Sequence, residues 1–223
     1  MLDNIFTLTF MTGLFAATLR MATPLIFATV GELFHEKAGV LNLGIEGSML
    51  LGGLVGFLTT WFTGNLWLGV LAAGLAGAAL SLLMALLAVT FGLNQLVCGL
   101  GITFLGTGLS HYLYRLVVGS PTVPPTIEAF PPLDLGALSD IPFAGPVLFS
   151  QNILVYAALA VAVLATLFFS KTTWGLRIRT IGENPAAADT MGINVNLTRY
   201  FSLVCGGFLM GVAGAYLSLA HFN

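Results

Sequence analysis

Long apolar runs separated by short polar stretches dominate the chain and predict six membrane segments. The runs cover about residues 5–30, 40–62, 66–91, 95–118, 152–169 and 200–220. About 20 apolar residues are enough for a helix to cross the hydrocarbon core of a bilayer. Abundant glycine inside these runs suits close helix packing in lipid and does not suit a β-barrel. The pattern predicts an all-α polytopic bundle that forms one transmembrane domain over residues 1–223.

The composition excludes a water-soluble domain. Hydrophobic residues make up 57% of the chain and charged residues 7%, against about 25% charged in soluble proteins. The net charge of -2 and the lack of a basic patch give no indication of nucleic-acid binding. The two cysteines, Cys98 and Cys205, lie in apolar runs, and the three histidines are far apart in sequence. These residues predict no disulfide, metal site or cofactor.

The distribution of basic residues predicts the orientation. Four of the seven Lys and Arg residues lie in the polar stretch 170–199, which should therefore be cytoplasmic. The stretch 119–151 holds Glu128, Asp134 and Asp140, has no basic residue and should lie outside. Counting back through the segments puts residues 31–39 inside and the N-terminus outside.

A short capped helix is predicted within residues 170–199. Asn184 is a good N-cap, Pro185 fits the first helical position, and alanines follow. Gly192 supplies a left-handed stop, so the helix has about seven residues and is about 10 Å long. Such a helix can be a docking element or an ordinary connector between membrane segments.

Polar residues in the first, second and fourth segments are candidates for a solute pathway. Asn42 and Glu46 are four residues apart and should share one helix face, and glycines nearby permit an unwound segment. A charge such as Glu46 inside a span usually faces a protein or water-filled interior. Glu46 therefore lines a pathway or pairs with Arg20. For Arg20, snorkelling toward the membrane surface and contact with the solute are further alternatives. Asn94 and Gln95 fit a simple cytoplasmic turn, with pathway contact as the alternative.

Other polar and small residues have simpler interpretations. Glu32, Glu36 and Lys37 are expected to be solvated charges at the cytoplasmic boundary, with gating contacts as the alternative. Small residues recur four apart, which predicts close helix packing. These sets are Ser48/Gly52/Gly56, Ala72/Ala76 and Gly207/Gly211.

Two stretches resemble a known family. Residues 182–193, Gly-Glu-Asn-Pro-Ala-Ala-Ala-Asp-Thr-Met-Gly-Ile, resemble the coupling helix of permease subunits of ATP-binding-cassette importers. Residues 31–50 resemble the branch that transports branched-chain amino acids, simple sugars and nucleosides, closest to the sugar and nucleoside members.

The resemblance implies a subunit of the bacterial inner membrane that is not itself an enzyme. Its partners would be cassette ATPases, a second permease that is identical or homologous, and an extracytoplasmic solute-binding protein. The chain has no G-x-x-x-x-G-K-[ST] phosphate loop, in agreement with ATP hydrolysis on a partner. Family members continue with further membrane segments, so the chain is expected to be C-terminally truncated. The coupling residues implied are Gly182, Glu183, Asn184, Pro185, Ala186, Ala187 and Gly192.

Other classes of function remain open from the residues alone. A secondary transporter driven by an ion gradient could use Glu46 and Arg20 as a proton-linked pair. An intramembrane enzyme would need a convergent nucleophile and base or a metal set, which the sequence lacks. A purely structural membrane subunit is the remaining alternative.

Overall fold

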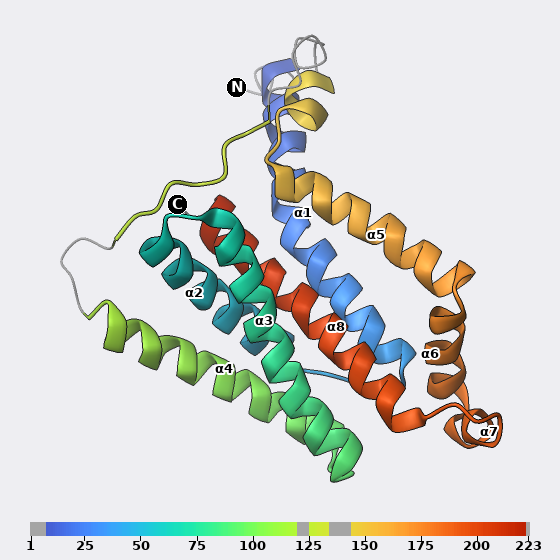
Figure 1. Ribbon diagram of the computed structural model, residues 1–223. Helices are drawn as coiled ribbons and strands as arrows, with labels where there is room; N and C mark the ends of the chain where they lie inside the picture. Colours follow the sequence, from blue (N-terminus) through green and yellow to red (C-terminus); the bar gives the residue numbers. More distant parts are fainter. Residues whose placement is uncertain (1–7, 120–124, 134–143, 222–223) are drawn as a thin grey trace.

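The computed structural model describes residues 8–119, 125–133 and 144–221 and is built from helices (Figure 1). The predicted start of the first segment at residue 5 and the acidic residues Asp134 and Asp140 lie outside these ranges. The elements, in chain order, are α1 (Leu8–Lys37), α2 (Ile45–Thr63), α3 (Leu66–Ala85), η2 (Leu86–Thr90), α4 (Gln95–Val117), η4 (Gly145–Phe149), α5 (Ile153–Lys171), α6 (Thr173–Glu183), α7 (Pro185–Thr190), α8 (Val195–Tyr216) and η5 (Leu217–His221).

Six helices are long and apolar enough to cross a membrane, and they coincide with the six predicted segments. They are α1, α2, α3 with η2, α4, α5, and α8 with η5. The predicted all-α polytopic bundle is therefore confirmed. The ends of individual helices differ from the prediction where polar residues continue a helix.

The first segment is longer than predicted, and the second begins later. Helix α1 continues through Pro24 and the polar residues 31–37, and it ends before Gly39, which has a left-handed φ of 75°. An internal proline is tolerated in a membrane helix where neighbouring groups satisfy the freed backbone. Residues 38–44 are not helical, so α2 starts at Ile45 rather than near residue 40. We call residues 38–44 the α1–α2 connection.

Asparagine side chains begin most of the later helices. The Oδ1 atoms of Asn65, Asn94, Asn152, Asn184 and Asn194 accept hydrogen bonds from backbone N–H groups in the first turns of α3, α4, α5, α7 and α8. These groups have no partner inside the helix, so each cap satisfies donors that would otherwise be exposed. Helix α6 is capped in the same way by Thr172. It was not predicted, and with α7 it fills most of the stretch 170–199.

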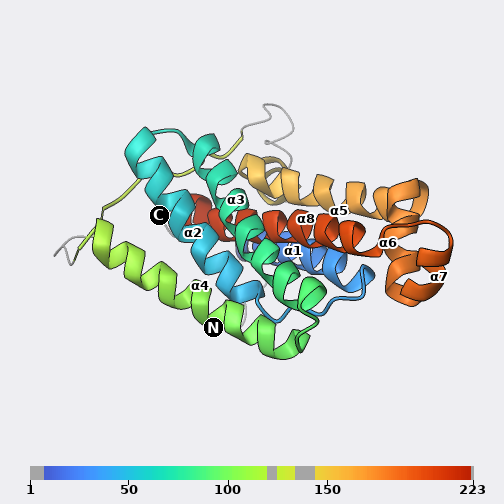
Figure 2. The ribbon, with the colours of Figure 1, turned by 60° about the horizontal axis from the view of Figure 1, so that its bottom comes forward.

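Helix α8 is the centre of the bundle and packs against α1, α2 and α3 (Figures 1 and 2). The contacts are made between backbones at glycines. A Cβ added at Gly52 would lie 2.7 Å from both Cα and the carbonyl oxygen of Gly211, and one at Gly31 would lie 2.6 Å from the Gly206 oxygen. The sets Ser48/Gly52/Gly56 and Gly207/Gly211 therefore pack as predicted. On α3 the contact residues are Ala73, Gly74 and Gly77, because Ala72 and Ala76 are rotated to half-buried positions.

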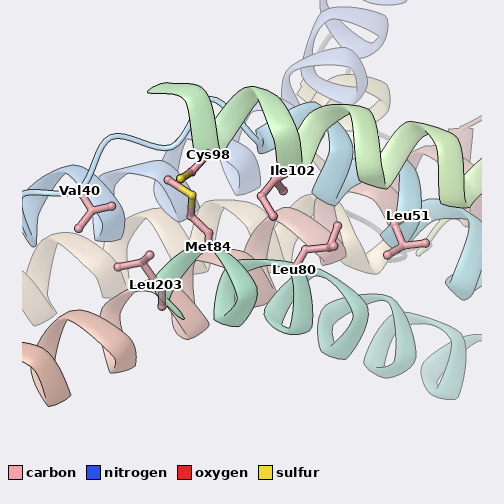
Figure 3. Packing of buried hydrophobic residues seen from close by; sticks show 8 residues of the cluster. Val40, Leu51, Leu80, Met84, Cys98, Ile102 and Leu203 are labelled. Carbon is pink, nitrogen blue, oxygen red and sulfur yellow. The ribbon is translucent and has the colours of Figure 1, made fainter. Parts of the chain in front are cut away.

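A buried cluster joins the α1–α2 connection to four helices (Figure 3). Leu203 from α8 and Met84 from α3 are fully buried, and Val40 of the connection is 1% exposed. Cys98 and Ile102 cover this cluster from α4. Cys98 is a free thiol that acts as a small apolar side chain, as expected.

Replacement of Gly52 by alanine is expected to destabilise the bundle. The added methyl group would meet the Gly211 backbone, and relief of such overpacking costs about 1–3 kcal/mol. Thermal unfolding of the detergent-purified protein should show a lower midpoint. Gly101→Ala is the matched control, since a Cβ there meets nothing within 4 Å. An unchanged midpoint for Gly52→Ala would contradict the described packing.

Candidate functional site

The predicted short helix is present and exposed at the end of α6. Helix α7 spans Pro185–Thr190, and Asn184 Oδ1 accepts a hydrogen bond from the Ala187 N–H at 3.0 Å. Gly192 has a φ of 78° and ends the turn, as the sequence predicts. Residues 183–187 are exposed, whereas Ala188 is buried. A cavity of about 590 Å³ lies beside α7 and is lined by Pro185, Ala186, Asp189 and residues 192–196.

Gly182 links this helix to the α1–α2 connection. A Cβ at Gly182 would meet the Lys37 carbonyl oxygen well inside contact distance, and a Cβ at Gly39 would lie 3.2 Å from Gly182 Cα. Nearby, Arg199 Nε of α8 donates a hydrogen bond to the Ala38 oxygen at 3.2 Å. Ile178 of α6 is fully buried in a cluster with Ala38 and Phe169. The segment α6–α7 is therefore fixed to the end of α1.

A network of buried polar groups gives the α1–α2 connection its shape. Asn42 donates from its backbone N–H to Glu32 Oε1 at 3.1 Å and from Nδ2 to His35 Nδ1 at 3.2 Å. Asn42 Oδ1 accepts from the Gly44 N–H at 2.8 Å. His35 is fully buried and donates from Nε2 to the Leu203 oxygen of α8 at 2.9 Å. Because the carbonyl only accepts, Nε2 carries the proton and Nδ1 is the acceptor for Asn42.

This network corrects two predictions. Asn42 lies before α2 begins and is 2% exposed, whereas Glu46 is exposed in the first helical turn, so the two do not share a helix face. Glu32 is not a solvated charge, since its side chain is 15% exposed and bonded to the connection. The helical spacing rule failed for Asn42 because the glycines of this region allow the chain to leave the helix.

Asn94 and Gln95 form the predicted turn and have structural partners. Asn94 Oδ1 accepts from the N–H groups of Leu96 and Val97 at 3.0 and 3.4 Å. Gln95 Oε1 accepts from the Leu41 N–H at 2.9 Å. The start of α4 is therefore attached to the same connection that begins α2.

Arg20 and Glu46 do not form the pair that the sequence suggested. Among the described residues, the only contact within 4.0 Å between a basic side chain and a carboxylate is that of His35 Nδ1 with Glu32 Oε2 at 3.3 Å. Arg20 Nε donates to the Ala16 oxygen of its own helix at 3.3 Å. Helical rise places Arg20 about 25 Å along α1 from Lys37, whereas Glu46 lies at the start of α2, close to the end of α1. That separation along α1 explains why the predicted pair is wrong.

Glu46 instead lies on a polar seam between α2 and α4. Thr103 Oγ1 donates to the Leu43 oxygen at 2.9 Å, and Ser110 Oγ donates to the Leu50 oxygen at 3.4 Å. Both bonds join positions 60 residues apart, so the two helices run parallel in constant register. Glu46 falls between these two bonds, and the same offset places it at the level of Gly106. We call this region the α2–α4 seam.

A cavity of about 770 Å³ continues the seam toward the far end of the bundle. Its walls include Leu50, Gly53 and Phe57 of α2, which follow Glu46 at spacings of four, three and four residues and share its helix face. Ser110, His111 and Tyr114 of α4 form the opposite wall. His111 Nδ1 donates to the Thr107 oxygen at 2.9 Å, which leaves Nε2 as an acceptor. Pockets of roughly 300–1,000 Å³ with few polar groups are typical of small-molecule sites.

Comparisons with known proteins identify the family of the chain. Residues 14–222 match the family model of the permease component of the branched-chain amino acid transport system. The chain belongs to this permease family. No solved structure matches it.

Curated relatives of this permease are named for sugar and nucleoside transport. A putative glucose ABC transporter permease of Haloferax volcanii is 41% identical over 217 residues, or 96% of the chain and 64% of the relative. A guanosine ABC transporter permease of Bacillus subtilis is 38% identical over 89% of the chain and 64% of the relative. A nucleoside ABC transporter permease of Lactococcus lactis is 34% identical over 89% and 65%. The chain thus spans just under two thirds of the length of these relatives.

The sequence did not single out the α4 side of the seam in this permease. Thr103, Thr107, Ser110 and Tyr114 follow a helical spacing of four, three and four residues in an otherwise apolar run. That spacing is the feature of the sequence that could have identified the α4 side of the seam.

The described residues contain no group of three or more His, Cys, Asp or Glu that could hold a metal ion.

Removal of the Asn42 side chain is expected to loosen the α1–α2 connection of the permease. Asn42→Ala removes the hydrogen bonds to His35 and Gly44, which costs about 1–3 kcal/mol because a buried acceptor and a buried donor lose their partner. Thermal unfolding in detergent should show the loss. Asn196→Ala, at an exposed position of α8, is the control. Equal midpoints for the two variants would contradict a structural role for Asn42.

Proposed function

We propose that this chain is the membrane-spanning permease subunit of an importer driven by ATP, and that it passes a nucleoside or simple sugar into the cell. ATP hydrolysis takes place on separate cassette ATPase subunits, so the chain is not itself an enzyme. A second permease subunit, identical or homologous, completes the pathway, and an extracytoplasmic binding protein delivers the solute. Family membership and the names of the relatives support this proposal.

Helix α7 is the proposed docking element for the ATPase. It is short, capped and exposed on the side of Glu183, Asn184, Pro185, Ala186 and Ala187, and Gly192 ends it. Gly182 has a different role in this proposal. Its backbone rests on Lys37 and Gly39, so it passes movement of α7 to the α1–α2 connection.

The α2–α4 seam is the proposed solute pathway. The single observation that carries this assignment is the position of Glu46, an exposed carboxylate in the first turn of a candidate span, on the same helix face as the cavity wall. Charged groups inside membrane spans usually face water-filled interiors. Asn42, Asn94 and Gln95 shape the cytoplasmic end of this pathway through the connection and do not line it. Arg20 lies outside it.

The same arrangement supports the proposed orientation in the inner membrane. Lys37, Gly182 and Arg199 belong to one end of the bundle, where α1, α4 and α6–α7 meet. This end carries most of the basic residues, so the positive-inside rule places it in the cytoplasm and the N-terminus outside.

Two variants are expected to separate docking from transmission. Glu183→Ala with Asn184→Ala removes the cap and a charge from α7, and it should abolish co-purification of the cassette ATPase in mild detergent. Gly182→Ala should retain the ATPase but lower ATP-dependent uptake by about tenfold, the effect of about 1.4 kcal/mol on the coupled step. Gly108→Ala, where a Cβ meets nothing within 4 Å, is the control. Retention of the ATPase by the double variant would contradict the assignment of α7 as the docking element.

Uptake in proteoliposomes is expected to respond to ATP and to Glu46. Glu46→Gln should lower uptake while the amount of folded protein stays normal, because it removes the carboxylate from the seam without changing its size. Full uptake by this variant would argue against the pathway. Uptake that survives without ATP but collapses with the membrane potential would identify an ion-driven secondary transporter instead.

A further inference from the structure

Helix α6 carries a basic and aromatic surface that the proposed transport function does not use. Lys171, Arg177 and Arg179 place three cations between the end of α5 and the end of α6, where Glu183 is the one carboxylate. Trp174 and Arg177 are exposed, whereas Ile178 and Ile181 of the same helix are fully buried. Figure 1 shows α6 at the edge of the bundle, between α5 and α7.

An aromatic stack fixes the position of this surface relative to the spans. The Arg177 guanidinium carbon lies 5.3 Å from the centroid of the Trp174 ring, and that ring lies 5.2 Å from the ring of Phe201. Phe201 and Leu197 belong to the candidate span of α8 and are 42% and 60% exposed. Trp174 therefore lies beside the first turns of a membrane helix, where indole rings are enriched at bilayer interfaces.

The cations of this surface are not neutralised by the protein. Within the described part of the chain, no carboxylate lies within 4.0 Å of Lys171, Arg177 or Arg179. Arg179 Nε is buried and has no hydrogen-bond partner. An anion of outside origin is thus the natural partner, and a guanidinium matches the oxygens of a phosphate in a planar, two-point arrangement.

We propose that the surface formed by Trp174, Arg177 and Lys171 binds the phosphate group of an anionic phospholipid. The indole packs beside Phe201 at the level of the headgroups, and Arg177 extends from it toward the phosphate. Basic surfaces at the cytoplasmic ends of membrane helices attract anionic lipids by about 1 kcal/mol per basic side chain. The ATPase is the less fitting partner, since Phe201 and Leu197 are exposed at bilayer depth, where a soluble protein does not reach.

Quenching of Trp174 fluorescence by brominated lipids tests this site directly. The chain has three tryptophans, so Trp61→Phe with Trp67→Phe leaves Trp174 as the only one. The protein is reconstituted in mixed phosphatidylglycerol and phosphatidylcholine vesicles in which one or the other lipid is brominated. At equal mole fraction, brominated phosphatidylglycerol should be favoured beside Trp174 by up to about fivefold, the ratio equivalent to about 1 kcal/mol. Added salt should reduce this preference.

Arg177→Gln in the same background should bring the two quenching efficiencies close to equality while Trp174 remains in contact with lipid. Arg115→Gln, at the opposite end of the bundle in α4, is the matched control and should retain the preference. Equal quenching by both lipids before any change at Arg177 would overturn the proposal. So would quenching by neither lipid, which would place this surface against a soluble partner. Neither outcome depends on whether the chain imports a solute.

Discussion

Backbone contact between helices at glycines is the constraint on which the rest of this structure depends. Lipid tails are as apolar as the side chains of the bundle, so helices in a membrane are held by close packing more than by a hydrophobic driving force. Here α8 lies against α1, α2 and α3 through Gly206, Gly211 and neighbouring small residues. Any side chain at these positions would push the helices apart. The positions of the α2–α4 seam and of α6 follow from this central packing.

The α1–α2 connection lies where these elements meet. It begins α2, accepts Arg199 from α8, donates to Gln95 at the start of α4 and touches Gly182 of α6. Its own shape depends on the bonds of Asn42 to Glu32, His35 and Gly44. Rigid attachment of this kind gives the proposed docking helix a short mechanical route to both walls of the proposed pathway. The anionic lipid proposed at Trp174 would contact the start of α6, whereas Gly182 near its end contacts the connection.

Local patterns allowed most of the fold to be predicted, and long-range contacts explain the misses. Apolar runs and the cap at Asn184 correctly predicted six spans and the helix after residue 184, because both depend on neighbours in sequence. The predicted pair of Arg20 and Glu46 failed because single-sequence spacing gives no depth for either residue. Asn42 was wrongly predicted to lie on a helix. The left-handed conformation of Gly39 and the contact of Asn42 with His35 decide where α2 begins, and residue spacing does not show either. The α4 wall was overlooked because its hydroxyl side chains become a site only when α2 is aligned with them.

The distance between the far ends of α2 and α4 during the ATP cycle tests this account most directly. Spin labels at Thr63→Cys and Val117→Cys, with Cys98 and Cys205 replaced by alanine, would report it in the assembled, lipid-embedded transporter. The account predicts that ATP shifts the distance distribution and that Gly182→Ala abolishes the shift while the ATPase stays bound. A distribution that ignores ATP, or a shift that persists in Gly182→Ala, would contradict the proposed route from α7 to the seam.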